Sequence, residues 1–456
     1  MKVLLSGATG LIGQAVGQEL VRRGHSVIAL TRNTAKAKAT LTFPCEIREW
    51  KNFDVAPQLK AEDKVDVVIH LSGESVADKR WSAEQKAQIK DSRVIGTRTL
   101  VQTFEARNEK LKAWVQGSAI GLYGDNGDQV VGEDHAAGSD FLAVVVKEWE
   151  AEADAYAAKA KHRIVSIRTG IVLSAHGGAL AKLFDIFHRG VGGRIGDGQQ
   201  YMSWIHIKDI ANLFVMAAEN DQVSGAINGS APEPVTNKEL TTKLSHALGR
   251  IEFLPVPTMA LKLALGEMSQ AILSSTRAKS RAQDLGFKFE YANFDSALAD
   301  LCRGMDDGSR VLESEQFVVQ PLDKVFEFFS SAHNLEELTP PFLNFKVLES
   351  STKEIEQGTL IDYKLALHGV PLKWRTLIES WDPPRSFVDT QLSGPYTKWH
   401  HTHTFEKLGH GTLLRDRVVF KLPLGLAGDL AASWKVVGDV KTIFDFRHKK
   451  ILELFA

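Results

Sequence analysis

The stretch from Val3 to Arg32 constrains the fold of this chain more than any other. It starts with a short apolar run, continues through a turn that carries Gly7, Gly10 and Gly13, enters a segment of helical period and ends in a second apolar run. A buried strand, a glycine turn, a helix and a parallel strand form one βαβ unit. In such a unit the first glycine permits the tight turn, the second leaves room for a pyrophosphate, and the third lets the helix pack closely on the strand. The pattern therefore predicts a dinucleotide site.

The residues after the second strand indicate which dinucleotide is bound. An NAD site places Asp or Glu there for the ribose 2′-hydroxyl, whereas this chain has Thr31, Arg32 and Asn33. An arginine guanidinium suits a 2′-phosphate, so we predict NADP(H) with Thr31 and Arg32 at that phosphate. The free N–H groups of the helix's first turn face the other phosphates. The predicted contacts of the turn are Gly7, Thr9, Gly10, Leu11, Ile12 and Gly13.

Bulk composition limits the classes of partner. The 456 residues are too many for one core and predict two or three domains. The formal net charge of −1 gives no general attraction to nucleic acid or anionic membrane, and no run approaches the roughly 20 apolar residues of a membrane span. Cys45 and Cys302 lie far apart, outside metal-ligand spacing, and are expected to be reduced thiols. We expect a cytoplasmic protein whose partners are small molecules.

Strands and helices continue to alternate after the first unit. Val65–Gly73 has the form of a buried parallel strand whose carboxyl end opens on the cofactor crevice, which predicts Leu71, Ser72 and Gly73 on the adenosine side. Helices are expected at Glu84–Arg107 and Phe141–Ala160, and further strands at Ala113–Ser118 and Arg163–Leu173. Six strands alternating with helices predict an α/β fold, a doubly wound parallel sheet of Rossmann type.

Three sequence blocks carry a family resemblance. They are A-D-K-R-W at Ala77–Trp81, R-T-G-x-V-L at Arg168–Leu173 and W-I-H-I-x-D at Trp204–Asp209. With these blocks the chain resembles the extended short-chain dehydrogenase/reductases, the architecture of nucleotide-sugar epimerases and dehydratases, and more narrowly their atypical epimerase-like subfamily. The resemblance runs from Met1 to about Leu301 and implies a domain at 1–302 with a substrate lobe at roughly 175–200 and 228–300.

The resemblance also implies two cofactor contacts, but the chain lacks one motif of the family. Arg93 stands where the family has the Asn of its N-x-x-G-T helix motif, and Val172 stands at the strand end beside the nicotinamide. Members of this class transfer protons with a Tyr four residues before a Lys on one helix, because positions i and i+4 share a face. None of the six tyrosines here is followed by Lys at that spacing. The corresponding positions are Phe141 and Val145, and the usual Ser/Thr partner is Ala119.

Without that dyad the sequence leaves three alternatives open. Other residues near the crevice take over proton transfer, the candidates being Tyr123, Ser118, Glu74 and His206. Alternatively, hydride transfer needs no strong general acid, or the domain binds NADP(H) without turnover. Three of these candidates also have a purely structural interpretation. His206 stands between two isoleucines, as a hydrogen-bonded core histidine does, Tyr123 is an aromatic residue that packing alone would explain, and Glu74 could cap the segment that follows it.

The pattern changes after residue 302. Residues 303–310 are short, polar and glycine-bearing, as in a linker, and residues 311–456 read as one strand, two short helices, a run of antiparallel strands and a closing helix from about Gly428 to Leu454. This order predicts an α+β helix-grip domain. On Pro321, Val325–Phe329 and Leu338–Phe342 it resembles the START-like, polyketide-cyclase-like (SRPBCC) superfamily, which implies a cavity for an apolar ligand.

The segment Trp399–His403 contains three histidines. In a strand, His401 and His403 share a face and His400 points the other way, so at most two converge locally, and any carboxylate ligand has to come from elsewhere. We therefore predict no metal there, with cavity-lining or surface histidines instead.

Three functional hypotheses follow. The first is an NADP(H)-dependent oxidoreductase or epimerase-like enzyme with a tethered module for an apolar small molecule. The second is a non-catalytic NADP(H)-binding sensor that carries the same module. The third is a scaffold that binds a partner protein.

Overall fold

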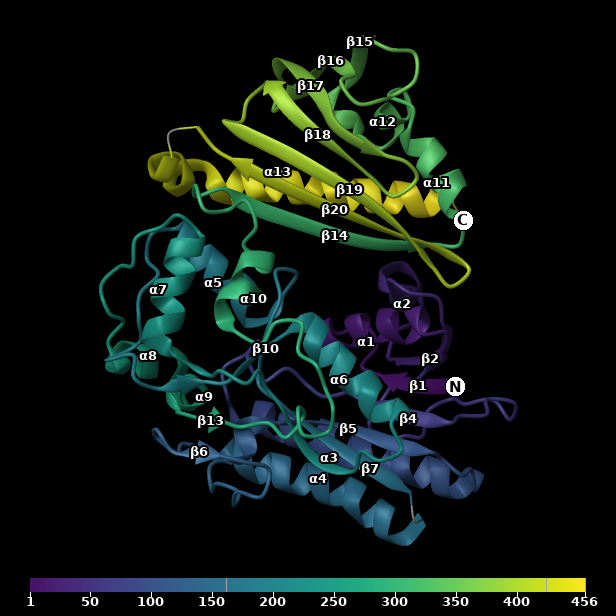
Figure 1. Cartoon of the computed structure of the whole chain (residues 1–456), viewed down its shortest axis with the longest axis vertical. Coiled ribbons are helices and arrows are strands. Elements are labelled where there is room, and N and C mark those ends of the chain that lie inside the picture. The colour runs from purple at the N-terminus through teal and green to yellow at the C-terminus, as the bar shows by residue number, and fades with distance from the viewer. Residues whose placement is uncertain (161, 424, 456) are drawn as a thin grey trace.

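The computed structural model describes residues 1–160, 162–423 and 425–455. It contains a parallel seven-stranded sheet in the first part of the chain and an antiparallel seven-stranded sheet in the last part (Figure 1). The parallel sheet has the order β11-β7-β5-β4-β1-β2-β3, so the doubly wound α/β fold predicted for the first part is confirmed. Its strands are β1 (Lys2–Ser6), β2 (Ser26–Thr31), β3 (Glu46–Glu49), β4 (Val67–His70), β5 (Ala113–Ala119), β7 (Arg163–Thr169) and β11 (Gly225–Gly229).

Helices cover both faces of the parallel sheet. On one face α1 (Leu11–Arg22) contacts α6 (Ile207–Glu219), and on the other α3 (Ala83–Arg107) contacts α4 (Phe141–Ala160), while α2 (Thr34–Thr40) follows β2 (Figure 1). Successive side chains of a strand point to opposite faces, so Leu5 belongs to the core under α1 and Leu4 to the core that contains Trp114. The helices predicted at Glu84–Arg107 and Phe141–Ala160 are present as α3 and α4.

Two predictions about strands need correction. Arg163–Leu173 is not one strand, because β7 ends at Thr169 and β8 (Ile171–Leu173) pairs with β10 (Trp204–His206) outside the main sheet. Gly170 marks the break, where an added Cβ would lie 2.6 Å from the carbonyl oxygen of Ser203. The edge strand β11 is a seventh strand that periodicity does not predict, since its sequence GAING has little apolar content.

A small lobe lies beside the parallel sheet. Its helices are α5 (Gly178–His188), α7 (Asn237–Ala247), α8 (Thr258–Leu265), α9 (Gln270–Leu273) and α10 (Phe294–Leu301), with 3-10 turns η1 (Ile120–Leu122) and η2 (Gly266–Ser269) nearby. Its short strand pairs are β9 (Tyr201–Met202) with β12 (Val235–Thr236) and β13 (Arg277–Ala278) with β6 (Val130–Val131). The helices α8 and α9 do not form one continuous helix, because the chain leaves the α-helix at Gly266, whose φ is 61°.

The antiparallel sheet has the order β14-β20-β19-β18-β17-β16-β15. Its strands are β14 (Arg310–Val318), β15 (Lys346–Ser350), β16 (Leu360–Leu367), β17 (Val370–Asp382), β18 (Ser386–Ser393), β19 (Lys398–Leu408) and β20 (Gly411–Lys421). The helical segments are α11 (Leu322–Phe329), α12 (Asn334–Glu337), η3 (Pro341–Leu343) and α13 (Gly425–Leu454). The long helix α13 runs along one face of the sheet (Figure 1), where Val440 and Phe444 pack on Val418 and Phe420.

The end of the β19–β20 hairpin joins the core of the first part of the chain. Leu408 and Leu413 are buried in the same apolar cluster as Phe43 and Val21. Around them Arg22 Nε donates to Glu406 Oε1 at 2.6 Å. The antiparallel sheet therefore packs on α1 and on the segment around Phe43 through an apolar centre with a charged pair at its edge.

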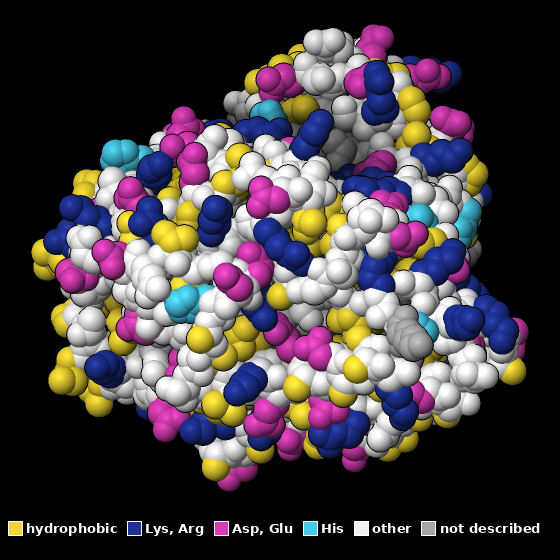
Figure 2. All heavy atoms as spheres, turned by 60° about the horizontal axis from the view of Figure 1, so that its bottom comes forward, with side chains coloured by type: hydrophobic (Ala, Val, Ile, Leu, Met, Phe, Trp, Pro, Cys, Tyr) yellow, Lys and Arg dark blue, Asp and Glu magenta, His cyan; other side chains and the backbone are white. Residues whose placement is uncertain are grey.

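The surface mixes charges of both signs. Lys and Arg side chains alternate with Asp and Glu over the face shown in Figure 2, in agreement with the net charge of −1. Within the described ranges, no helix combines the length and the apolar character that crossing a membrane requires.

Candidate functional site

The glycine turn between β1 and α1 is tightly packed. Gly7 has φ 70°, and a Cβ on it would lie 2.8 Å from the backbone carbon of Leu71. A Cβ on Gly13 would lie 2.1 Å from the carbonyl oxygen of Gly7, so only glycine lets α1 approach the turn this closely. At Gly10 the nearest atom to an added Cβ is the Gly7 oxygen at 3.2 Å.

The start of α1 fits a phosphate group. Gly10 is the N-cap residue, and no side chain among the described residues caps the helix, which leaves the first-turn N–H groups near Leu11 and Ile12 for an external acceptor. Thr9 lies in the exposed turn just before them. The residues predicted for pyrophosphate binding thus form a cradle of the required kind.

Strands β2 and β4 flank β1, and their carboxyl ends border the same crevice. Arg32 follows β2 directly and is exposed, while the hydroxyl of the preceding Thr31 accepts a hydrogen bond from Asn33 N at 3.2 Å. Leu71, Ser72 and Gly73 follow β4, as predicted for the adenosine side.

His70, the buried last residue of β4, takes part in a hydrogen-bond network at the end of that strand. Ser6 Oγ lies 2.6 Å from His70 Nδ1 and accepts the backbone N–H groups of Leu71 and Ser72 at 3.1 and 3.3 Å. His70 Nε2 lies 3.1 Å from Thr97 Oγ1. Since Ser6 Oγ already accepts two bonds, its hydroxyl donates to Nδ1, and the ring is neutral with its proton on Nε2. Burial, and to a lesser extent nearby Arg93, lower the pKa of His70 to about 3.

Arg93 lies against the crevice wall rather than in water. Its Nη1 donates to the carbonyl oxygens of Glu74 and Ile89 at 2.9 and 3.0 Å, and its guanidinium lies 5.2 Å from the centre of the Trp149 ring. A Cβ on Gly73 would lie 2.9 Å from its guanidinium carbon. Burial lowers the pKa of Arg93 to about 10, so it stays a cation at neutral pH beside the turn after β4.

Val172 also borders the glycine turn. An added Cβ on Gly178 would lie 3.2 Å from Leu11 Cδ2 and 3.6 Å from the Val172 oxygen. In β8 Val172 pairs with Ile205 of β10. The segment for which the resemblance implies a nicotinamide contact, β8 with the first residues of α5, therefore lies close to the start of α1.

A pocket adjoins this segment, and two of the family blocks and the segment just before the third contribute to it. Its wall includes Trp81 from the first block with Val76 just before that block, Thr169, Gly170 and Ile171 from the second, and Tyr201, Met202 and Ser203 just before the third. The wall is mostly apolar, and the Trp81 and Phe141 rings stack edge to face with centres 5.1 Å apart. These segments lie far apart in sequence, but they line one pocket.

Tyr123 and Ser118 lie in a buried network behind this pocket. Tyr123 Oη donates to Asn228 Oδ1 at 2.7 Å and accepts from Arg168 Nη1 at 2.9 Å, and burial raises its pKa. Arg168 forms a two-point ion pair with Glu150 at 2.9 and 2.8 Å, and Ser118 Oγ donates to the same carboxylate at 2.5 Å. These contacts give both residues a structural role and do not support the predicted proton transfer.

The other two catalytic candidates, His206 and Glu74, also contact residues outside the pocket. His206 is 1% exposed, caps α6 by accepting Lys208 N at 3.2 Å, and stacks on Tyr291 with ring centres 3.8 Å apart. Glu74 Oε1 lies 3.6 Å from Lys79 Nζ. None of the four candidates belongs to the pocket wall that the described residues form.

Sequence reasoning missed Tyr201, the phenol of the pocket wall. Its ring lies 4.7 Å from the Arg277 guanidinium, and its backbone N donates to Ser275 Oγ at 2.8 Å. The signal was present, because Tyr201 lies in the segment that leads into the W-I-H-I-x-D block. Spacing to a lysine was the wrong criterion for finding it.

Two family models match the chain. The model described as the NAD dependent epimerase/dehydratase family covers residues 3–228, and one described as a domain of unknown function, DUF1731, covers residues 256–301. A protein of Arabidopsis thaliana named epimerase family protein SDR39U1 homolog, chloroplastic, is 38% identical over 313 residues, which are 65% of this chain and 86% of the relative. The chain belongs to the NAD dependent epimerase/dehydratase family.

Solved structures resemble this epimerase-family chain as well. Human epimerase family protein SDR39U1 (isoform 2) with NADPH is 29% identical, with a TM-score of 0.59 over 67% of this chain and 100% of the other. A nucleoside-diphosphate sugar epimerase from Corynebacterium glutamicum is 32% identical, with a TM-score of 0.53 over 66% of this chain and 58% of the other. Family membership confirms the predicted class of cofactor, a nicotinamide dinucleotide. The family models end at residue 301, before the antiparallel sheet.

Beyond the matched part, the antiparallel sheet and its helices enclose a cavity. The wall is largely aromatic and aliphatic, with residues such as Phe329, Leu338, Tyr363, Trp374, Trp399 and Phe444. Tyr363 Oη is paired with Thr376 Oγ1 at 2.9 Å. A group of polar and charged side chains, Asp389, His401, His403 and Arg447, interrupts the apolar wall at one place.

The histidine segment is arranged as the strand period predicts. His401 and His403 are buried on the cavity side of β19, whereas His400 Nε2 lies 3.8 Å from Glu379 Oε2 outside the cavity wall. Burial and the neighbouring His403 lower the pKa of His401 to about 4. For His403 the opposing effect of burial is outweighed by hydrogen bonds to Asp389 and Asp416, which raise its pKa.

Proposed function

We propose that the chain is an NADP(H)-dependent oxidoreductase that acts on a small, largely apolar molecule. The observation that carries this proposal is one mostly apolar pocket next to Val172, which is lined by residues of the first two family blocks and of the segment just before the third. A sugar nucleotide would need many polar partners, whereas this wall offers few. Phe141, in the place of the family tyrosine, adds a further apolar surface.

The choice of NADP(H) is supported by Arg32 at the end of β2 and by the NADPH in the human relative's structure. The bound cofactor would supply the hydride. In this chain Gly7, Gly10 and Gly13 would hold the pyrophosphate, and Arg93 would place a cation beside the crevice.

The proton required by such a reaction has a candidate donor in Tyr201. Its phenol belongs to the pocket wall, and the Arg277 guanidinium lies 4.7 Å from the centre of its ring. Tyr123 is the matched comparison, because it is a phenol in the same domain that is engaged in a buried network.

The test is NADPH consumption with a panel of small apolar aldehydes, ketones and enones. We expect Tyr201→Phe to lower kcat while NADPH affinity is kept, and Tyr123→Phe to reduce stability with kcat kept in the folded fraction. Loss of kcat in Tyr123→Phe alone would reverse the two roles.

The alternative is an NADP(H)-binding sensor without turnover. The apolar residues Phe141 and Val145 at the positions of the family's proton-transfer dyad favour it. It predicts tight NADPH binding and no NADPH consumption with any compound of the panel.

We further propose that residues 311–456 form a START-like helix-grip module that holds an apolar ligand, joined to domain 1–302 by residues 303–310. The long α13 against a curved antiparallel sheet, and the aromatic wall between them, support this assignment. Native mass spectrometry of the purified full-length protein should detect a co-purified apolar molecule. Replacement of Leu338 by Glu in the cavity wall should abolish its retention, and unchanged retention would refute the module.

A further inference from the structure

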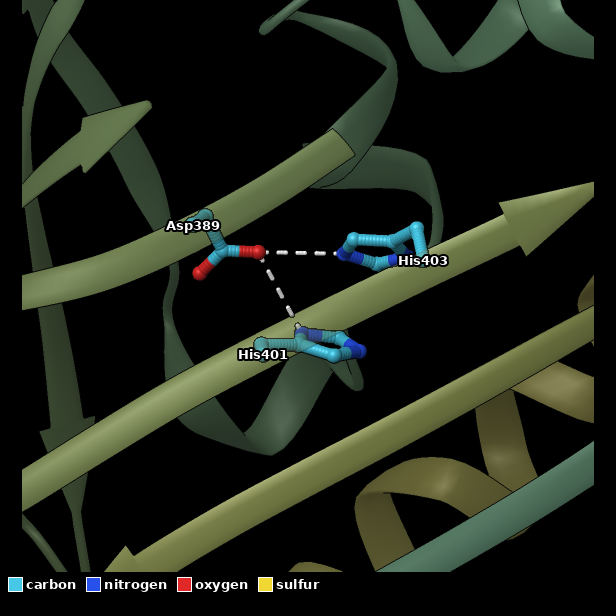
Figure 3. Close-up of side chains that lie close together, drawn as sticks. All are labelled: Asp389, His401 and His403. Atoms are coloured by element: carbon cyan, nitrogen blue, oxygen red, sulfur yellow. Dashed lines mark hydrogen bonds and ion pairs between the residues drawn. The ribbon is translucent and has the colours of Figure 1, made fainter. Parts of the chain in front are cut away.

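Three side chains converge on the inner wall of the C-terminal cavity. Asp389 extends from β18 toward the rings of His401 and His403 on β19 (Figure 3). Asp389 Oδ2 lies 3.4 Å from His401 Nδ1 and 3.0 Å from His403 Nε2, and these three atoms all lie within 4.8 Å of one another. Both histidines are about 95% buried.

A second carboxylate holds the far side of both rings. Asp416 Oδ1, on β20, lies 3.0 Å from His401 Nε2 and 2.7 Å from His403 Nδ1. Arg447 Nη2, on α13, lies 3.6 Å from the same oxygen. Each imidazole therefore directs one nitrogen toward Asp389 and the other toward Asp416.

One nitrogen of each ring is left to face a shared ion. His401 Nε2 is hydrogen-bonded to Asp416 Oδ1 at 3.0 Å, and His403 Nδ1 faces the same oxygen, so His401 Nδ1 and His403 Nε2 are the nitrogens turned toward Asp389. A hydrogen bond joins His403 Nε2 to Asp389 Oδ2 at 3.0 Å, and an ion bound between these atoms would replace its proton, because metal ligands are deprotonated.

We propose that Asp389, His401 and His403 bind a divalent transition-metal ion of the zinc or ferrous class. Metal–ligand bonds of about 2.0–2.1 Å separate neighbouring ligand atoms by roughly 3.0–3.4 Å, which the two measured contacts of Asp389 match. Two imidazoles and one carboxylate favour zinc or iron over magnesium or calcium. The remaining coordination positions face the cavity, since all three residues line it.

Asp416 is a positioning residue in this arrangement. Carboxylates that accept the second N–H of metal-bound histidines fix the ring orientation, and losing one weakens metal binding by about 10- to 100-fold. The apolar wall around the site would restrict water and leave the open positions to an oxygen-bearing ligand.

The test is a titration of the full-length, chelator-treated protein with Co²⁺, followed by competition with Zn²⁺. We expect one equivalent of bound Co²⁺ with a visible absorption band that Zn²⁺ removes and Mg²⁺ does not. His401→Gln and Asp389→Asn should each weaken binding by at least about 100-fold, and Asp416→Asn by about 10- to 100-fold. His400→Gln is the matched control on the same strand and should bind as the wild type does.

The wild-type titration decides the matter even if a substitution prevents folding. Absence of a Zn²⁺-displaceable Co²⁺ band would show that protons alone balance the cluster and would overturn the proposal. Undiminished Co²⁺ binding in folded His401→Gln would overturn it equally.

Discussion

The buried His70 makes the stability of the parallel sheet depend on pH. In the folded chain its Nδ1 accepts the Ser6 hydroxyl and its Nε2 faces Thr97 Oγ1, so the ring has no room for a second proton. Its pKa is about 3 in the folded state, against an ordinary value of 6.5. We expect acid to weaken the sheet at this point, where Ser6 also holds the backbone of Leu71 and Ser72.

The sign and size of the effect follow from these two pKa values. The unfolded chain takes up the proton first as the pH falls, so the contribution of His70 to stability is complete above pH 6.5 and is lost between pH 6.5 and about 3. The slope in that window is about 1.4 kcal/mol per pH unit, which gives a loss of about 2 kcal/mol between pH 8 and pH 5. The figure changes little for any folded-state pKa below about 4.

The assay compares urea unfolding of the wild type and His70→Asn between pH 8 and pH 5. Tryptophan fluorescence reports on the relevant region, because the Trp50 and Trp114 rings lie 5.9 and 6.0 Å from the His70 ring. We expect the variant to be less stable at pH 8, by about 1 kcal/mol for a lost hydrogen bond, and to lose about 2 kcal/mol less than the wild type on acidification. His246→Asn, at an exposed site in α7, should keep the wild-type pH dependence. Parallel pH profiles for wild type and His70→Asn would refute the reasoning.

Three other substitutions test other parts of the molecule. Arg32→Glu should weaken NADPH binding by at least about tenfold and narrow the preference over NADH, as measured by calorimetry, because a charge-assisted bond to phosphate becomes a repulsion. Glu150→Gln should lower the unfolding free energy in urea by about 3 kcal/mol, because it leaves the charge of Arg168 buried without its partner. Arg22→Ala should change the same free energy by less than about 1 kcal/mol, because its ion pair with Glu406 is partly exposed.

Local patterns were sufficient to predict most of the first fold. The strand, glycine turn and helix at the N-terminus are encoded by neighbouring residues, and helix α4 begins and ends at the residues expected. The failures have a common cause, which is contact between distant segments. Strand β11 is held by pairing with β7 rather than by its own composition, and Gly170 ends β7 because the Ser203 backbone comes close.

The candidate site was harder to predict than the fold. The sequence identified the family blocks but not the residues that line a common pocket. Tyr123, which is buried behind the pocket, was therefore chosen as a candidate instead of Tyr201 in its wall. The carboxylates beside the two histidines could not be predicted for the same reason. Asp389 and Asp416 come from the strands on either side of β19, and only the register of three strands brings them to His401 and His403.

Strand β19 connects the two parts of the chain physically. Near its middle it carries His401 and His403 in the cavity wall, and at its end Leu408 is buried with Val21 of α1 and Phe43. Helix α1, whose first turn fits the cofactor phosphates, thus packs with its last turn against β19, the strand that lines the cavity. Because Leu408 and Leu413 fill the same apolar core as that helix, separating the two parts would expose this core to water, at a cost of about 1.5–3 kcal/mol for each large apolar side chain. A group bound in the cavity and a dinucleotide at the glycine turn would therefore contact opposite ends of one continuous packed unit.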